Sequence, residues 1–536
     1  MRKKYIVVTG WVISGIGKWV TTASAGFFFS EKYKVTPIKL DGYLNIDPGT
    51  MNPHEHGEVF VLADGAEVDM DFGHYERFLW SECSGDQSIS MGKIFAWILE
   101  KERRWDFLGK TVQMIPHVTN HISDRIEEVF SQSWGDICMI EVGWTVGDIE
   151  VELYLEAIRQ MKRNKKKEDF LHIHLTYVPI PGWVDEQKTK PTQQSVNLLQ
   201  SKWLFPDIIM ARGNEKLTKS SREKIALFAN LREDRVFSLP DVESIYTIPR
   251  LLKKQKFDAL LYGKLGIPFY EGNKLELWNS RLDQENKTEL RIWIVGKYTA
   301  LEDSYSSVVE ALKHAGKNLW IQINISFIDT RKKNGIEKVK NCDGCIIPWG
   351  FWDTWIENML ETLTYIREET IPCLWICLWL QLMVIEYFRN ILNAPLANRL
   401  EFDKKCKPND TITLLDSQKN IVNLGGTMRL GKQISKLKSW KIKELYADAY
   451  RLQWSKIEER FRHRYEVNPN FAESLKDTDL RVTGTSPAWI VQFIEMNNTI
   501  HPYYVATQSH PELSSKLEDP APLFIWLIRS CLEQKK

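Results

Sequence analysis

The sequence contains little glycine, few cysteines and no excess of charge of either sign. Its 536 residues hold 29 glycines, fewer than the ~7% typical of globular proteins, and 8 cysteines. The net charge is +1, so no broad basic field predicts nucleic-acid binding. The cysteines lack paired spacing apart from Cys342-Asp-Gly-Cys345, which has no second ligand pair. We therefore expect a reducing, cytoplasmic setting and no zinc site.

We expect no secretory signal at the start of this sequence, and polar residues interrupt its longest apolar run. No charged segment followed by an apolar one stands at the start, and residues 5–9 are typical of a first strand. The run 371–388 has the length of a membrane helix, but Gln381 and Glu386 lie within it. We predict a buried strand followed by a helix there, and no membrane partner.

Strand-like runs alternate with amphipathic segments through both halves of the chain. This alternation is typical of α/β proteins with parallel sheets, and the length allows two or three domains. A polar stretch predicts a linker over 268–289, between an α/β domain at 1–267 and a second at 290–536. The strands expected in the first half are residues 5–9, 35–40, 137–142, 171–178 and 207–211.

Residues 8–18, Val-Thr-Gly-Trp-Val-Ile-Ser-Gly-Ile-Gly-Lys, lie between a strand and a helix-like stretch. Backbone N–H groups and a lysine at a helix N-terminus stabilise anions, so the segment predicts a phosphate-binding loop. Its spacing is not that of a Walker A motif. A glycine-rich turn with one exposed lysine is the alternative.

Carboxylates follow or end apolar segments at Asp71, at Glu141 and at Asp148-Ile-Glu150. They are hard oxygen ligands suited to a phosphate-bound Mg²⁺, which needs only one or two protein ligands. The segment Lys188-Thr-Lys190-Pro-Thr-Gln193 adds two cations and amide donors suited to a triphosphate. Each motif alone is typical of a solvated loop, but together they predict a nucleotide site.

A cysteine and a distant histidine have the surroundings of a nucleophile and its base. Cys377 stands between an apolar run and a helix-like segment, and His510-Pro-Glu512 comes far downstream. A free thiol is largely protonated at neutral pH, so an imidazole and a helix N-terminus must favour the thiolate. The two halves together predict an enzyme that releases ammonia from an amide and uses it at a nucleotide-activated centre.

In their order along the chain, these motifs resemble the CTP synthase family over nearly the whole sequence. The resemblance implies a P-loop-like, parallel-sheet synthetase domain followed by a class I glutamine amidotransferase domain. The stretches that carry it are residues 8–18, 39–43, 45–51, 56–60, 69–78, 109–117, 141–150, 188–193, 224–228, 241–246, 377–381, 425–431, 462–466 and 510–512.

The resemblance also implies the reaction and its partners. ATP phosphorylates O4 of UTP, and ammonia from L-glutamine, or free ammonia, displaces the phosphate to give CTP. Mg²⁺ is the implied cofactor, GTP the allosteric activator and CTP the feedback inhibitor. The implied assembly is a cytoplasmic homotetramer.

Site roles follow where the sequence matches the family motifs. Lys18 and Lys39 match lysines that face ATP phosphates, while Asp71 and Glu141 match the Mg²⁺ ligands. All residues expected to bind nucleotide are Ser14, Gly15, Gly17, Lys18, Lys39, Asp71, Asp148, Ile149, Glu150, Lys188, Thr189, Lys190, Pro191, Thr192, Gln193 and Lys224.

In the second half, Cys377 matches the nucleophile, His510 its base and Glu512 the carboxylate that orients the base. The residues expected around glutamine are Gly350, Leu378, Gln381, Glu401 and Arg464. Ser509 and Arg399-Leu400 depart from the family pattern beside this pocket.

Tryptophan stands at many positions where the family has glycine. The chain has 21 tryptophans, and those at family glycine positions include Trp11, Trp19, Trp80, Trp105, Trp144, Trp203, Trp349, Trp352, Trp355, Trp375, Trp379 and Trp526. Glycine readily adopts positive φ and lets a ligand approach the backbone closely, whereas an indole side chain disfavours both. In a nucleophile elbow the neighbouring positions are expected to be small.

Three accounts of these tryptophans remain open: a decayed enzyme, a tryptophan-rich adaptation, and a UGA codon that the cell translates as glycine, as some bacterial lineages do. The charged and nucleophilic residues survive, which favours the third. Exchanging the twelve raises glycine from 29 to 41 and lowers tryptophan from 21 to 9. If the indoles are present, each costs ~1–3 kcal/mol against a total stability of ~5–15 kcal/mol, and we predict an inactive or unfolded chain.

Two rival functions remain at this point. One is another ATP-dependent amidotransferase, such as a cobyrinate-type amidase, which the 188–193 and 148–150 motifs disfavour. The other is a pseudoenzyme or filament scaffold that keeps the fold without turnover.

Overall fold

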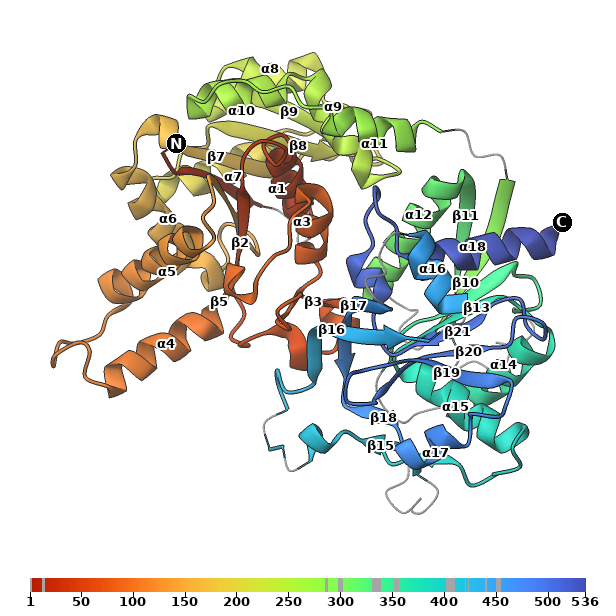
Figure 1. The fold of residues 1–536 in the computed structure, drawn as a ribbon. Helices are drawn as coiled ribbons and strands as arrows, with labels where there is room; N and C mark the ends of the chain where they lie inside the picture. The colour runs from red at the N-terminus through yellow and green to blue at the C-terminus, as the bar shows by residue number, and fades with distance from the viewer. Residues whose placement is uncertain are drawn as a thin grey trace. The chain divides into compact units, whose positions relative to one another are not determined.

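The chain folds into two compact units (Figure 1). Unit 1 comprises Met1–Asp47 and His74–Leu282, and unit 2 comprises Pro48–Gly73 and Asp283–Lys536. The computed structural model describes residues 2–11, 15–284, 288–296, 302–329, 339–350, 356–401, 410–419, 421–422, 424–438, 441–449 and 455–536. Ser14, Trp352 and Trp355 lie outside the described residues.

A seven-stranded sheet, all parallel, forms the centre of unit 1. Its order is β5-β2-β6-β1-β7-β8-β9. The strands are β1 (Lys4–Gly10), β2 (Val35–Asp41), β5 (Ser88–Ser90), β6 (Ile137–Val142), β7 (Phe170–Tyr177), β8 (Ile208–Gly213) and β9 (Val236–Pro240). The five strands expected from the sequence are confirmed, because their near-continuous apolar runs suit strands buried on both faces.

Helices follow most strands of unit 1 and bury apolar stripes on the sheet. Tyr5 and Val7 of β1 share a core cluster with Ile122 and Ile126 of α5 and Ile158 of α6. The helices are α1 (Lys18–Phe27), α3 (Asp71–Leu79, of which residues from His74 on belong to this unit), α4 (Met91–Arg103), α5 (Thr119–Gln132), α6 (Glu152–Asn164), α7 (Lys190–Ser201), α8 (Lys219–Ala229), α9 (Ile248–Lys254), α10 (Phe257–Leu265) and α11 (Lys274–Leu282). The segment expected as a linker therefore contains a helix, α11.

Unit 2 is built on a nine-stranded mixed sheet of order β11-β10-β12-β13-β21-β20-β19-β16-β17. The first five of these strands are parallel, and the remaining pairings are antiparallel. The strands are β10 (Thr288–Gly296), β11 (Ile321–Asp329), β12 (Gly344–Ile347), β13 (Cys373–Ile376), β16 (Arg429–Leu437), β17 (Lys456–His463), β19 (Leu480–Thr485), β20 (Val491–Met496) and β21 (Tyr504–Thr507).

Smaller elements complete unit 2. A three-stranded sheet joins β14 (Asn398–Arg399), β15 (Asp410–Leu414) and β18 (Tyr465–Val467), and β3 (Val59–Val61) pairs with β4 (Glu67–Asp69) as an antiparallel hairpin. The helices are α2 (Pro53–His56), α12 (Ser306–Leu319), α14 (Ile356–Glu368), α15 (Leu378–Asn390), α16 (Lys441–Asp448), α17 (Pro469–Glu473) and α18 (Pro522–Lys535).

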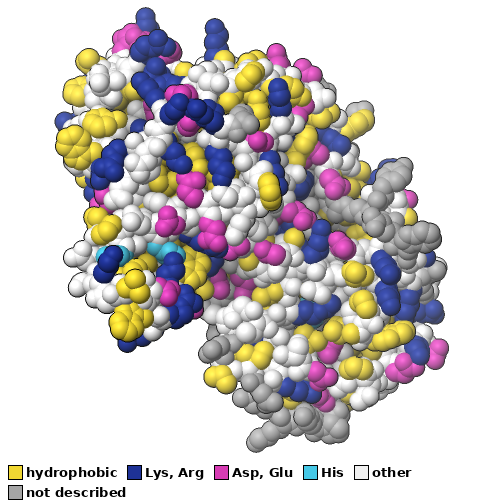
Figure 2. All heavy atoms as spheres, turned by 60° about the vertical axis from the view of Figure 1, so that its left-hand side comes forward, with side chains coloured by type: hydrophobic (Ala, Val, Ile, Leu, Met, Phe, Trp, Pro, Cys, Tyr) yellow, Lys and Arg dark blue, Asp and Glu magenta, His cyan; other side chains and the backbone are white. Residues whose placement is uncertain are grey.

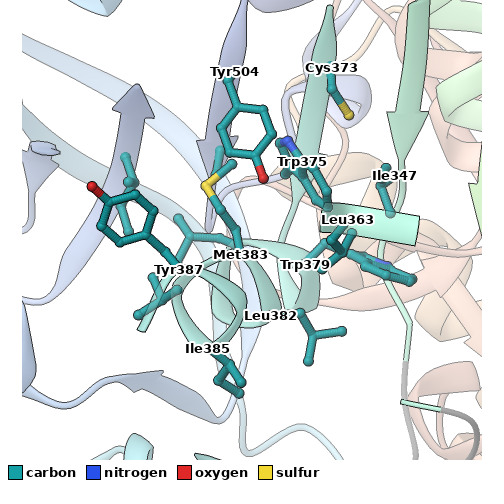
Figure 3. Packing of buried hydrophobic residues seen from close by; sticks show 14 of the residues in the cluster. Ile347, Leu363, Cys373, Trp375, Trp379, Leu382, Met383, Ile385, Tyr387 and Tyr504 are labelled. Atoms are coloured by element: carbon teal, nitrogen blue, oxygen red, sulfur yellow. The ribbon is translucent and has the colours of Figure 1, made fainter. Parts of the chain in front are cut away.

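The apolar run 371–388 forms strand β13 and helix α15, as expected from its interrupted pattern. Trp375 and Trp379 from this run are fully buried, and Figure 3 shows them among Ile347, Leu363 and Tyr504. The core thus accommodates both indoles, contrary to the expectation that these positions must be small. Among the described residues, neither indole Nε1 atom finds a hydrogen-bond partner.

Within the described residues, no helix is both long and apolar enough to cross a bilayer. Lys and Arg are interspersed with Asp and Glu on the face drawn in Figure 2, in keeping with the net charge of +1.

Candidate active site

Cys377 occupies the turn between β13 and α15. Its backbone has φ 60° and ψ −108°, a conformation that L-residues rarely adopt and that marks strained functional turns. Its N–H donates to the carbonyl of Thr507 (2.7 Å), and its thiol donates to the carbonyl of Arg462 (3.4 Å). The thiol thus stands at the N-terminus of α15, the positive end of the helix dipole.

His510 and Glu512 form a buried pair in the same unit. The distance from His510 Nδ1 to Glu512 Oε1 is 2.8 Å, and the side chains are only 4% and 0% exposed. Burial lowers the pKa of His510, but the Glu512 carboxylate and Cys377 more than offset it and raise the pKa to about 10. The carboxylate therefore fixes one ring nitrogen, leaving Nε2 as the atom that can exchange a proton with the thiol.

Gln381 and Gln508 link the nucleophile helix to the strand that precedes the base. Gln381 Nε2 donates to Gln508 Oε1 and to the carbonyl of Tyr465, both at 2.9 Å. Gln381 is buried one turn after Cys377, and Leu378 is the first residue of α15. This arrangement orders the helix N-terminus where backbone N–H groups can stabilise a developing oxyanion.

The other expected glutamine-pocket residues have protein partners. Glu401 makes an ion pair with Arg399, whose guanidinium lies 4.4 Å from the ring centre of Tyr465. Arg464 Nη1 donates to Gln418 Oε1 (2.5 Å). Gly350 is buried in the segment that follows β12. The departure at Arg399 thus supplies a counter-ion for Glu401.

In unit 1 the phosphate-loop motif leads into α1. Gly15 and Gly17 have φ of 75° and 96°, which suits glycine, and Lys18 is the first helical residue. The Lys18 ammonium donates to the carbonyl of Trp144 (2.7 Å) and is buried. The structure thus confirms the strand–glycine–helix context that a phosphate loop requires.

Charged groups gather at the carboxyl ends of β2 and β6. Lys39 lies opposite Glu141 in the parallel register, and Lys39 Nζ is 3.3 Å from Asp41 Oδ1. Glu141 is buried and accepts a hydrogen bond from the Tyr75 hydroxyl (2.6 Å). Asp41 and Tyr75 were not expected as site residues, although a carboxylate at a strand end was a signal for Asp41.

The remaining nucleotide candidates fall into two groups. In the first group, Asp148 accepts a hydrogen bond from the N–H of Thr145 (2.8 Å). It precedes a short 3-10 helix, Ile149–Val151, which contains Glu150. The Ile149 side chain is 82% exposed. The second group comprises Lys188 and Thr189 just before α7, Lys190, Pro191, Thr192 and Gln193 in its first turn, and Lys224 in α8.

Glu141 has the chemistry of a magnesium ligand. Its carboxylate lies at the strand end where polar side chains gather, and Mg²⁺ prefers one or two carboxylates together with phosphate oxygens. Asp71 is the first residue of α3. Among the described side chains, no cluster of three or more His, Cys, Asp or Glu could hold a metal without such phosphates.

Two family models match successive parts of the chain. The family model described as CTP synthase N-terminus matches residues 4–267, and the one described as Glutamine amidotransferase class-I matches residues 300–530. The CTP synthases of Archaeoglobus fulgidus and Borreliella afzelii are 43% and 45% identical to this chain over 539 residues. Each alignment covers 99% of both sequences. The chain belongs to the CTP synthase family.

CTP synthases are ligases that aminate UTP to CTP at the expense of ATP, with nitrogen from glutamine, and this enzyme has both the synthase and the amidotransferase domain. The CTP synthase of Methanopyrus kandleri is similar over the same span, at 41% identity over 543 residues and 99% of each chain. The cobyrinate-type alternative is therefore wrong.

Several site residues of the CTP synthase could not be found from motif spacing. Arg462 and Thr507 contact Cys377 through backbone carbonyls, which any residue type provides. Gln508 lies two residues before His510 in the sequence, but only the fold shows its contact with Gln381.

Proposed function

We propose that Cys377, His510 and Glu512 carry out the glutaminase step of this CTP synthase. The observation that supports this most strongly is the buried His510–Glu512 pair in the unit where Cys377 begins a helix. His510 takes the thiol proton, and the thiolate attacks the amide carbon of glutamine. The leaving nitrogen receives the proton as ammonia, and water then hydrolyses the thioester to glutamate. Backbone N–H groups near Leu378 and Gly350 stabilise the oxyanion.

In unit 1, the proposed role of Lys18 and Lys39 is to bind ATP phosphates, and that of Lys188, Gln193 and Lys224 is to bind UTP. Lys18 now donates to a backbone carbonyl, an interaction that a phosphate oxygen can replace. Glu141 is the proposed Mg²⁺ ligand in this unit, and the family motif gives Asp71 the same role; Mg²⁺, when bound, would supply positive charge to the phosphoryl group. Asp148, Ile149 and Glu150 would contact bound CTP.

The finer assignments follow the family. We propose that GTP activates the glutaminase step, that CTP inhibits by feedback, and that the enzyme works as a cytoplasmic homotetramer. Sedimentation with and without ATP and UTP tests the assembly, and a chain that stays monomeric at micromolar concentration would contradict it.

The activity is tested by incubating the purified chain with UTP, ATP, Mg²⁺ and glutamine. CTP, ADP, phosphate and glutamate are expected in equal amounts. The assay is run on two versions, one with the sequence as it stands and one with glycine at the twelve tryptophans that match family glycines. Failure of both versions to form CTP, even with ammonium chloride, would refute the proposed function and favour a pseudoenzyme.

A further inference from the structure

The β3–β4 hairpin lies against strand β17 of the same unit. Arg462 Nε is 2.8 Å from Glu67 Oε1, and the two side chains are 6% and 1% exposed. Arg460 Nη1 donates to the carbonyl of Val61 (3.1 Å). The N–H of Lys432 on the neighbouring strand β16 donates to the carbonyl of Ala63 (2.9 Å). The buried side chains of Arg460 and Arg462 therefore hold the hairpin against β17.

The backbone of the same two arginines contacts the catalytic pair. The carbonyl of Arg462 accepts from the Cys377 thiol (3.4 Å), and the carbonyl of Arg460 accepts from the N–H of His510 (2.7 Å). A bridge between Phe461 and Ser509 adds a further link from β17 to the segment of the base. A shift of β17 therefore moves nucleophile and base relative to each other.

We propose that the β3–β4 hairpin positions Cys377 and His510 for glutamine hydrolysis by fixing Arg460 and Arg462. Glu67 is thus a positioning residue, which contacts neither substrate nor the reacting atoms. The proposal rests on the proposed glutaminase function. Its physical basis is that the buried Arg462 guanidinium needs a counter-charge, so β17 cannot keep its place when Glu67 loses its charge.

The test compares Glu67→Gln with Glu458→Gln on β17. Glu458 pairs with Lys432 at 3.5 Å, but its side chain is 58% exposed, so its loss is expected to change glutamine hydrolysis less than about twofold. Glu67→Gln is expected to lower kcat roughly 10- to 100-fold with KM nearly constant. Alkylation of Cys377 by iodoacetamide should slow in parallel.

Thermal unfolding is recorded with each variant. A Glu67→Gln protein that melts earlier but keeps kcat and the alkylation rate would overturn the proposal, because the ion pair would then be structural only. Arg460→Lys, which keeps the charge but not the reach to Val61, provides a second test if Glu67→Gln does not fold; its glutaminase pH profile should shift. An unaltered chain that cannot hydrolyse glutamine would refute the proposed function instead.

A second, independent observation concerns backbone strain at tryptophan. Among the described residues, 14 residues other than glycine have positive φ, and seven of them are tryptophans. These are Trp80, Trp105, Trp134, Trp144, Trp203, Trp320 and Trp489, with φ from 52° to 66°. A Cβ atom crowds the backbone in this region, so it is populated mainly by glycine and, less often, asparagine.

Five of the seven stand just after a helix, at the place where glycine usually ends it. After α7, the N–H of Leu204 donates to the carbonyl of Leu199 (3.2 Å), across Trp203. After α10, the N–H of Ile267 donates to the carbonyl of Tyr262 (3.2 Å), across Gly266. The two turns share the same hydrogen bond, but the residue with positive φ is Trp203 after α7 and Gly266 after α10.

Packing does not explain four of the seven indoles. The side chains of Trp105, Trp134, Trp203 and Trp489 are 68%, 86%, 75% and 77% exposed, so little apolar burial offsets the backbone strain. We propose that the protein made in its own cell carries glycine at all seven positions, through a codon translated there as glycine.

The φ angles support four of the twelve tryptophans that stand at family glycine positions and add three others. Trp80, Trp105, Trp144 and Trp203 belong to that set, whereas Trp134, Trp320 and Trp489 are new. Six other members have ordinary φ, so the backbone does not distinguish glycine from tryptophan there; they are Trp11, Trp19, Trp349, Trp375, Trp379 and Trp526.

Mass spectrometry of tryptic peptides from the protein of its source cell tests the proposal. Glycine is expected at all seven positions, and tryptophan there would overturn the proposal.

A stability measurement adds an independent test. Replacing the seven by glycine should raise the melting temperature by roughly 2–4 °C per position. Trp183→Gly is the matched control, because Trp183 is 87% exposed without positive φ; an equal rise in that control would contradict the strain argument.

Discussion

The two catalytic regions differ in how their side chains are held. In unit 2, the proposed glutaminase residues bind one another: His510 binds Glu512, and Gln381 binds Gln508. In unit 1, Lys18 of the proposed phosphate loop donates to a backbone carbonyl. The proposed glutaminase site is thus preorganised by its own side chains. In the proposed nucleotide site, Lys18 binds a protein group that a phosphate oxygen can replace.

Removal of the nucleophile should distinguish the activities of the two regions most strongly. Cys377→Ala is expected to lower glutamine-dependent CTP formation at least about 10³-fold, because no other thiol can form the thioester. CTP formation from ammonium chloride should stay within about twofold of the unaltered enzyme. Equal loss of both activities would contradict the separation.

Lys18→Ala should have the opposite pattern. Loss of a cation from the phosphate loop is expected to lower CTP formation about 10²- to 10³-fold with either nitrogen source. Glutamine hydrolysis without nucleotides should not change. The measurement is CTP formation with glutamine and with ammonium chloride, and a defect confined to glutamine would show that Lys18 acts elsewhere.

Glu512→Gln tests the preorganisation of the base. We expect glutamine hydrolysis to fall roughly 10²-fold or more, since the imidazole loses the carboxylate that orients it. The pKa of His510 is raised to about 10, so its contribution to stability is fully present below pH 6.5 and is lost as the pH rises through about 10. Thermal unfolding from pH 6 to 10 should therefore show a decline that is weaker in Glu512→Gln.

Lys188→Ala should have the smallest effect of the four. Lys188 pairs with Glu186 at the surface, and its loss is expected to raise the KM for UTP about tenfold with little change in kcat. Initial rates at varied UTP check this. An unchanged KM would place Lys188 outside the nucleotide site.

Local pattern was sufficient for five of the seven strands of the unit 1 sheet and for the nucleophile region. The run 371–388 was correctly divided into a strand and a helix, because Gln381 and Glu386 exclude a membrane span and Cys377 marks the turn. Strands β5 and β9 were missed, since Ser88–Ser90 is short and polar and Val236–Pro240 is short and ends in proline.

Contacts between distant segments were not accessible from the sequence. Glu67 and Arg462 are separated by 395 residues, and neither residue type alone indicates that the β3–β4 hairpin belongs to unit 2. Strained turns were also missed in part. Comparison with the family pattern named Trp80, Trp105, Trp144 and Trp203, whereas Trp134, Trp320 and Trp489 are identified only by their positive φ.

Nitrogen tracing tests the joint action of the two regions most directly. The enzyme is given UTP, ATP, Mg²⁺ and glutamine labelled with ¹⁵N at the amide, in the presence of unlabelled ammonium chloride. We predict ¹⁵N in the amino group of CTP from the unaltered enzyme and only unlabelled CTP from Cys377→Ala. Labelled CTP from Cys377→Ala would contradict the account, because the nitrogen would then be released without the thiol.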